Sequence, residues 1–141
     1  MHLVVDGMNV IGSRPTGWWR DRAKARRELV GELTAARPTL QADELTVVFD
    51  GRPGDAERAA ADEAPIEVRF APGGPNAADD AIVELIRQAP DPGAVTVVTS
   101  DGALSERVRR AGASVEGVGS FRRRLADLDG SAGPASREGG R

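Results

Sequence analysis

Five aspartates in this sequence stand at positions where carboxylates could act together chemically. They are Asp6, Asp50, Asp79, Asp80 and Asp101. Three of them close or follow a short apolar run rich in β-branched residues, and the adjacent pair begins an apolar helix-like segment, "ADDAIVELI" (78–86). Unpaired carboxylates that converge repel one another and raise each other's pKa, so a divalent cation is their natural compensating partner.

The residue types of the chain restrict the metal and the reaction. There is no cysteine, and the single histidine, His2, begins a strand-like run where a structural role is expected. Carboxylate oxygens without histidine or cysteine select hard cations, Mg²⁺ or Mn²⁺. A hydrated ion of this kind suits phosphodiester chemistry, because it can activate water and neutralise charge on the phosphate in the transition state. The acids therefore indicate metal-assisted hydrolysis of a phosphodiester.

Short apolar runs alternate with helix-like segments along the chain. The strand candidates are 2–6, 45–50, 66–70, 94–100 and, more weakly, 113–118, and the helix candidates lie at about 20–36, 55–63, 77–89, 103–111 and 120–128. This alternation predicts an α/β fold with a mainly parallel sheet of about five strands and helices on both faces. Ligands bind such sheets outside the carboxyl ends of the strands, and all five acids are expected at that edge.

Each of the strand-end acids also has a purely structural interpretation. Asp6 could form an Asx-type turn, Asp50 belongs to an Asp-Gly turn pair, and Asp101 could cap the helix that follows it. For one such residue alone the structural interpretation is the stronger one. The convergence of several carboxylates on one edge favours a metal site.

Helical geometry separates Asp79 from Asp80. Because each residue advances about 100° around a helix, Ile82, Val83 and Ile86 lie within about 60° of Asp79. Asp80 lies instead on the polar side, beside Glu84 and Arg87. A carboxylate at the rim of an apolar face needs a partner, so Asp79 is the predicted metal ligand of the pair. The alternative is structural, since Asn76 followed by Asp79 resembles an N-cap with an acid at the third helical position. Both interpretations can hold together.

Length and composition indicate one domain. The 141 residues are expected to form a folded domain over 1–128 and a small, polar, glycine-rich disordered tail over 129–141. No segment approaches the roughly 20 apolar residues of a membrane span, and Asp6 interrupts the N-terminal apolar run that a signal peptide needs, so a cytoplasmic location without a membrane partner is expected. The net charge of -3 means that nucleic-acid binding would have to come from local basic patches.

Four motifs resemble a known family. They are "VVDGMNVIG" (4–12), "VVFDG" (47–51), "AADDAIVELI" (77–86) and "VVTSDGAL" (97–104). In this order and spacing they resemble the YacP-like branch of the NYN domain, within the PIN-like nuclease superfamily, over about residues 2–125. The resemblance implies a single-domain, Rossmann-like α/β/α sandwich and a metal-dependent ribonuclease, with endonucleolytic cleavage as the expected mode and Mg²⁺ or Mn²⁺ as cofactor.

The resemblance also implies roles for individual residues. Asp6, Asp79 and Asp101 occupy the positions of the family's catalytic, metal-binding acids, and Asp80 and Asp50 are further candidates. Asn9 matches a family asparagine that orients the first acid or contacts substrate. Some relatives carry another acid where this chain has Asn76. The resemblance therefore leaves open whether the site holds one metal ion or two.

RNA is the implied partner, whether messenger, transfer or ribosomal RNA, including RNA on the ribosome. The residues expected to contact it are Trp18 by base stacking and Arg20, Arg22 and Arg26 through phosphates, with Arg122, Arg123 and Arg124 as a second basic patch. The simpler alternatives are solvated helix faces for the arginines and a core position for at least one of the two tryptophans. The chain does not indicate its oligomeric state.

Other functions fit the sequence less well. A receiver domain needs a lysine near the end of a late strand, and the only lysine is Lys24. A haloacid-dehalogenase-type phosphatase needs a second aspartate where this chain has Met8, and the glycine-rich loop of a dinucleotide-binding domain is missing. The alternative that stays open is an RNA-binding or ribosome-associated module on a nuclease scaffold whose catalysis is dormant.

Overall fold

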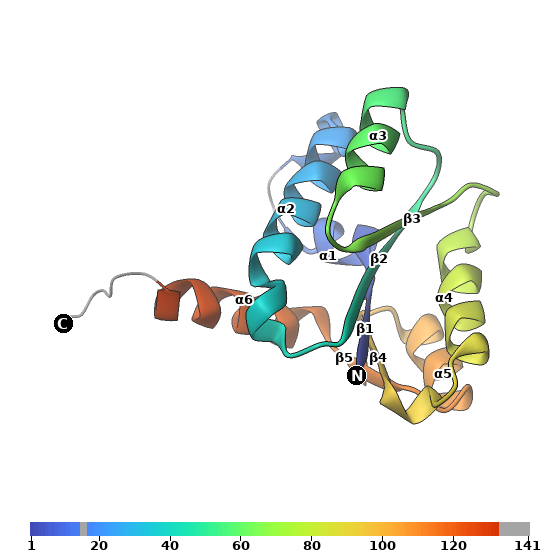
Figure 1. Ribbon diagram of the computed structural model, residues 1–141. Helices are drawn as coiled ribbons and strands as arrows, with labels where there is room; N and C mark the ends of the chain where they lie inside the picture. The colour runs from blue at the N-terminus through green and yellow to red at the C-terminus, as the bar shows by residue number, and fades with distance from the viewer. Residues whose placement is uncertain (15–16, 133–141) are drawn as a thin grey trace.

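A five-stranded parallel sheet forms the centre of the computed structural model, which describes residues 1–14 and 17–132 (Figure 1). The strands are β1 (His2–Asp6), β2 (Glu44–Asp50), β3 (Glu67–Ala71), β4 (Val95–Val98) and β5 (Ser114–Glu116). The helices are α1 (Gly7–Gly12), α2 (Arg22–Leu40), α3 (Asp55–Glu63), α4 (Ala77–Gln88), α5 (Gly102–Arg110) and α6 (Val118–Ala132), with short 3-10 turns η1 (Trp18–Arg20) and η2 (Pro92–Ala94). The predicted α/β fold is confirmed, and each predicted strand and helix has a counterpart.

The strand order, β3-β2-β1-β4-β5, reverses direction beside β1. The chain first builds outward from β1 to β2 and β3, and then returns through α4 to place β4 on the other side of β1. Open parallel sheets bind ligands at such a reversal. Val5 pairs with Val98, so β1 and β4 end almost level, and the residues just after them meet at one edge.

Helices cover both faces of the sheet, because alternate strand residues point in opposite directions. On one face Leu3 and Val5 belong to a core that includes buried residues of α1, α2 and α6. On the other face Val4 and Val48 belong to a core with α4 and α5, and Figure 1 shows these two helices together on that side. By the same alternation, Asp6 points toward the face that α4 and α5 cover.

The segment directly after β1 differs from its prediction. The turn expected after Asp6 is a short helix, α1, which starts at Gly7. A Cβ atom on Gly7 would lie 2.4 Å from Phe49 Cδ1 and 3.0 Å from the Val48 carbonyl oxygen, so only glycine allows α1 to pass this close to β2. The close approach keeps the first residues of α1 over the carboxyl end of the sheet.

Two boundaries near α2 and the C-terminus also differ from the predictions. Helix α2 continues through Pro38 to Leu40, which is buried. Helix α6 continues to Ala132, so the tail predicted for 129–141 begins inside a helix, and residues 133–141 lie outside the described residues. Within the described ranges, the structure has no helix of the length and apolar character needed to cross a bilayer.

Candidate functional site

A depression of about 290 Å³ opens at the carboxyl edge of the sheet. Its lining consists of Asp6, Met8, Asn9, Asp50, Asn76, Asp79 and Asp101. The four acids come from the ends of β1 and β2 and from the first turns of α4 and α5, segments far apart in the sequence. The fold therefore brings four of the five singled-out aspartates to one place.

Asp6 is the buried member of this group, with only 5% of its surface exposed. The Thr99 hydroxyl donates a hydrogen bond to Asp6 Oδ2 at 2.8 Å. Burial raises the pKa of Asp6 to about 6, the Thr99 hydrogen bond opposes this rise, and the negative charges of Asp79, Asp50 and Asp101 add to it. Three negative charges therefore act on Asp6, and in the described part of the chain no basic side chain is hydrogen-bonded to it.

Thr99 contacts two acids of the depression and was not among the residues predicted from the sequence. Its hydroxyl donates to Asp6 and accepts a hydrogen bond from the Asp101 amide at 3.1 Å, so one side chain fixes two of the acids. The next residue, Ser100, donates its amide to Asn9 Oδ1 at 2.7 Å, which ties α1 to the end of β4. The signal available in the sequence was the polar "TSD" run directly after a buried strand.

Asp50 and Asp101 each cap a helix and also line the depression. Asp101 Oδ1 accepts from the Leu104 amide at 2.8 Å, as an N-cap does, and Asp50 Oδ1 accepts from the Ala78 amide at 3.2 Å. Asn76 occupies the N-cap position of α4, as the structural interpretation has it, but with a φ of 68° its side chain makes no cap hydrogen bond. Asp50 supplies that acceptor from β2. These bonds use one oxygen of each carboxylate.

The adjacent aspartates of α4 point to different surroundings. Asp79 is half-buried in the depression, where burial and then the charges of Asp101 and Asp50 raise its pKa, partly offset by Arg107. The Asp80 side chain is 68% exposed and pairs with Arg107 at 2.9 Å. The two carboxylates therefore differ in burial and in electrostatic environment.

The donor chemistry of the depression suits a hard cation. Asp6, Asp79 and Asp101 offer carboxylate oxygens, with Asp50 beside them, and the raised pKa values of Asp6 and Asp79 reflect a negative potential that a divalent ion would offset. In the described part of the chain, no three acidic or histidine side chains lie close enough together to form a ready coordination sphere. Holding an ion therefore requires side-chain rotation in the depression.

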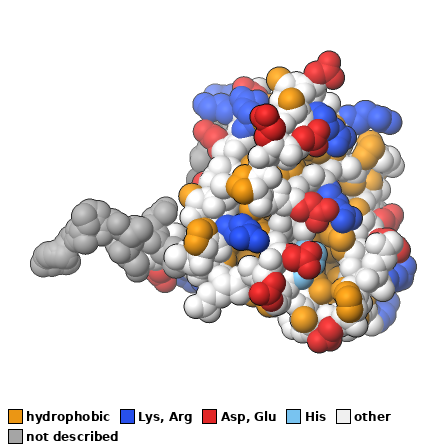
Figure 2. All heavy atoms as spheres, in the orientation of Figure 1, with side chains coloured by type: hydrophobic (Ala, Val, Ile, Leu, Met, Phe, Trp, Pro, Cys, Tyr) orange, Lys and Arg blue, Asp and Glu red, His pale blue; other side chains and the backbone are white. Residues whose placement is uncertain are grey.

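Of the residues predicted to contact substrate, Asn9 lines this depression. The predicted arginines and Trp18 are not in its described lining. Arg26 is bound by the buried Glu57 through two hydrogen bonds, one of them 2.8 Å from Nη2 to Oε1. Trp18 packs against the core with the Arg22 guanidinium 5.5 Å from its ring, as expected for one of the two tryptophans. Arg20 lies beside Trp19, which is 57% exposed. On the face seen in Figure 2, acidic and basic side chains are interspersed.

The chain is similar in fold to solved structures. The crystal structure of a mutant of Rae1 (YacP) from Bacillus subtilis matches with a TM-score of 0.71 and 22% identity over 91% of this chain and 76% of that chain. A second structure of Rae1 (YacP) from Bacillus subtilis matches with a TM-score of 0.68 and 21% identity over 94% and 77%. The T5 D15 protein, co-crystallized with metal ions, matches with a TM-score of 0.50 and 13% identity over 82% and 53%.

The sequence comparison with protein families gives a more specific result than the fold. No curated protein matches the chain. The profile of the YacP-like NYN domain matches residues 3–133, which is nearly the whole described chain and contains all four motifs of the carboxyl edge. The protein therefore belongs to the YacP-like NYN domain family.

Proposed function

We propose that this protein is a metal-dependent ribonuclease that hydrolyses RNA phosphodiester bonds endonucleolytically with Mg²⁺ or Mn²⁺. The observation that carries the proposal is the buried Asp6 carboxylate, whose pKa is raised to about 6 in a depression that it shares with three other acids. Uncompensated carboxylates gathered in a depression destabilise a fold unless a ligand uses them. Membership of the YacP-like NYN family supports a nuclease. The T5 D15 protein, which is similar in fold, was co-crystallized with metal ions, and this agrees with the proposed metal dependence.

The proposed ligands of the ion are Asp6, Asp79 and Asp101, with Asp50 as a fourth candidate. When bound, the ion supplies a Lewis acid that activates water and neutralises charge on the phosphate. Thr99 holds Asp6 through Oδ2, which leaves Oδ1 for the ion, and the Leu104 amide similarly fixes Oδ1 of Asp101. Asp80 lies toward Arg107 and is not required in this arrangement.

Two further features of the depression bear on the proposed reaction: the orientation of Asn9 and the protonation of Asp6. Asn9 is fixed by the Ser100 amide through its carbonyl oxygen, so its NH₂ group is the part that can contact substrate. Without a cation, Asp6 retains its proton up to a pH of about 6. The protein must therefore release this proton before Asp6 can act as a ligand, which favours activity above that pH. We propose a cytoplasmic location for this activity.

The direct experiment incubates the purified protein with labelled RNA and with Mg²⁺, Mn²⁺ or EDTA. Cleavage with either metal that EDTA and Asp6→Asn suppress supports the proposal. The matched control is Asp62→Asn, which removes an exposed carboxylate at the end of α3 and is expected to leave cleavage unchanged. Cleavage by the Asp6→Asn protein at the wild-type rate would refute the assignment.

The second candidate function is an RNA-binding module with dormant catalysis. It is favoured by one observation, that among the described residues no three acids are spaced to hold an ion without rearrangement. The same experiment separates the two functions. RNA binding without cleavage in either metal would favour the module over the nuclease.

A further inference from the structure

A second hollow, of about 330 Å³, adjoins the acid depression between α1 and α6. Met8 and Asn9 line both hollows, so the two adjoin at the start of α1. Farther from the acids, this α1–α6 groove is bounded by Gly12 and Ser13 on one side and by Arg122 of α6 on the other. A chain that crosses the acid depression can therefore continue into the groove.

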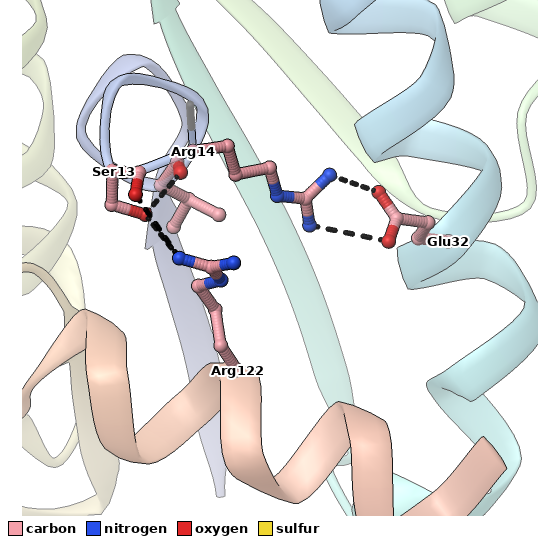
Figure 3. A network of polar contacts seen from close by, with 5 residues as sticks. Ser13, Arg14, Glu32 and Arg122 are labelled. Atoms are coloured by element: carbon pink, nitrogen blue, oxygen red, sulfur yellow. Dashed lines mark hydrogen bonds and ion pairs between the residues drawn. The ribbon is translucent and has the colours of Figure 1, made fainter. Parts of the chain in front are cut away.

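Arg122 is held in the groove by neutral oxygens. Its Nη1 donates to the Ser13 carbonyl oxygen at 3.1 Å and to Ser13 Oγ at 3.3 Å, as Figure 3 shows. The Ser13 hydroxyl in turn donates to the Val10 carbonyl oxygen at 2.7 Å. A guanidinium has five N–H donors, and both bonds to described residues use the same nitrogen. Among the described residues, the other donors of Arg122 have no hydrogen-bond partner, so a ligand can use them.

Two other arginines beside this contact, Arg14 and Arg124, are neutralised, in contrast to Arg122. Arg14 makes a two-bond ion pair with Glu32 of α2, at 2.7 and 3.2 Å (Figure 3). Arg124, two residues after Arg122, makes a two-bond pair with Glu116 at 3.0 and 2.9 Å. A guanidinium bound by carboxylates has little net charge to offer, whereas one bound by a carbonyl and a hydroxyl keeps its full charge.

The glycines of the groove keep it open without being required for packing. A Cβ atom on Gly119 would meet only Arg123 Nη1, at 3.6 Å, and one on Gly12 would meet only Trp18 Cζ2, at 3.8 Å. Both distances are ordinary van der Waals contacts, so the fold would accept a side chain at either position. The space that they leave is available to a ligand.

We propose that the α1–α6 groove binds the RNA nucleotide next to the scissile phosphate, and that Arg122 contacts the backbone phosphate on that side. This inference rests on the proposed ribonuclease function and specifies its substrate as an unpaired strand. The scissile phosphate must reach the depression that contains Asp6, and the neighbouring nucleotide must enter the groove, which a base paired with a second strand cannot do. A guanidinium held in place and carrying full charge is suited to bind a phosphate through two parallel hydrogen bonds.

The test compares Arg122→Gln with Arg37→Gln in an Asp6→Asn background that prevents cleavage. Glutamine removes the charge of Arg122 and keeps an uncharged N–H donor on a shorter side chain. Arg37 is an equally half-buried arginine that donates to a neutral oxygen, the Asp43 carbonyl, at the other end of the sheet, so it is a matched control. Arg122→Gln is expected to weaken binding of a short single-stranded RNA by about tenfold and to lower the salt slope by about 0.7, whereas Arg37→Gln leaves both unchanged.

A scan of neutral linkages locates the contact. Single methylphosphonate linkages placed along the RNA are expected to weaken binding to the Asp6→Asn protein, and one linkage beside the cleavage position is expected to have no effect once Arg122 is glutamine. Equal sensitivity of both proteins to every linkage would overturn the contact. Stronger binding of duplex RNA than of the single strand would overturn the unpaired substrate.

A blocking variant tests the groove independently of Arg122. Gly119→Phe is expected to fill the hollow and weaken RNA binding, with Ser120→Phe, on the neighbouring exposed position, as the control. If the wild type cleaves RNA and all groove variants bind and cleave like their controls, the groove proposal fails alone. If the wild type neither binds nor cleaves RNA, the proposed function itself fails.

Discussion

The two ends of the sheet shift the pKa of a carboxylate in opposite directions. At the carboxyl end, Asp6 faces other acids and its pKa is raised to about 6. At the amino end, Glu67 lies between Thr46 and Arg69, which donate hydrogen bonds to its two oxygens at 2.9 and 2.7 Å. Burial raises the pKa of Glu67, but these hydrogen bonds outweigh burial and leave the pKa below its usual value. At the amino end Arg69 pairs directly with Glu67, whereas at the carboxyl end, among the described residues, no basic side chain pairs with Asp6.

A threonine has the same role at both ends. Thr46, which is 1% exposed, donates to Glu67 and contacts His2 Nε2 at 2.8 Å, just as Thr99 donates to Asp6. The single hydroxyl proton of Thr46 is donated to Glu67. In the contact between His2 Nε2 and Thr46 Oγ1, His2 Nε2 is therefore the donor and the hydroxyl oxygen accepts. The difference between the ends is therefore the missing cation beside Asp6. The amino end stabilises the fold, whereas the carboxyl end retains a negative potential at the cost of stability.

Cleavage is the property in which the two ends should differ most. We expect Asp6→Asn to lower metal-dependent RNA cleavage about a thousandfold, because it removes a charged ligand from the reacting centre. Glu67→Gln removes a carboxylate of the same sheet and is expected to keep the wild-type rate. Initial rates with labelled RNA and Mg²⁺ measure both. A rate for Glu67→Gln as low as that of Asp6→Asn would show that the two ends do not differ in function.

The pH dependence of stability should have opposite signs at the two ends. Because the pKa of Asp6 is higher in the folded protein than in the unfolded chain, protonated Asp6 favours the folded state. This contribution to the free energy of unfolding is complete below a pH of about 4 and is lost as the pH rises through 6. At pH 8 without metal, Asp6→Asn should therefore stabilise the protein by up to about 3 kcal/mol, and at pH 4 it should have no such effect. Urea unfolding in EDTA at both pH values measures this.

Glu67 supplies the opposite case for the same measurement. Because the pKa of Glu67 is lowered in the folded protein, ionised Glu67 stabilises the fold. This contribution to the free energy of unfolding is present above the usual glutamate pKa and is lost as the pH falls through the lowered pKa. Glu67→Gln should therefore destabilise the protein at pH 8 and have less effect in acid. If Asp6→Asn and Glu67→Gln change the free energy of unfolding in the same direction at pH 8, the two ends of the sheet do not differ in this way.

Metal binding should stabilise only the carboxyl end. An ion that binds the folded state at a concentration one hundred times its dissociation constant raises the free energy of unfolding by about 2.7 kcal/mol. We expect Mg²⁺ or Mn²⁺ to raise the melting temperature of the wild type and of Glu67→Gln, and not that of Asp6→Asn. An equal rise in all three proteins would place the ion elsewhere.

The sequence predicted the elements and the position of the acids better than the contacts between them. Strand-end placement of Asp6 and Asp50 follows from apolar runs that a parallel sheet requires, and the helical period places Asp79 on the apolar side of α4. The Thr99 contact could not be predicted, because it joins residues 93 positions apart in sequence. Helix α1 was missed because its six residues are too few for a periodic signal.

Tertiary packing also overrode two local signals. Pro38 predicts an end to α2 near residue 36. The helix instead continues for another turn to Leu40, whose side chain is buried in the core and stabilises that turn. Asn76 has the sequence position of an N-cap, yet Asp50 from a neighbouring strand accepts the hydrogen bond instead. Local propensity places a helix, and long-range contacts decide how its end is completed.

The two threonines allow a subtler comparison. Thr99→Val keeps the shape of the side chain but removes the hydrogen bond that opposes the rise in the pKa of Asp6. We expect about a tenfold loss of cleavage at pH 7, with the pH profile moved to higher pH. Thr46→Val should cost about 1 kcal/mol of stability without moving the profile. Unchanged profiles in both variants would mean that Thr99 does not control the protonation of Asp6.

The smallest expected effect distinguishes the adjacent aspartates of α4. Asp79→Asn should lower cleavage as strongly as other changes in the depression, because Asp79 lies among the acids and its pKa is raised by burial and by Asp101. Asp80→Asn removes an exposed pair with Arg107, which is worth less than about 1 kcal/mol, so cleavage should stay within about threefold of the wild type. A loss of cleavage in Asp80→Asn equal to that in Asp79→Asn would mean that both carboxylates serve the site, and that the acidic end of the sheet extends beyond the depression.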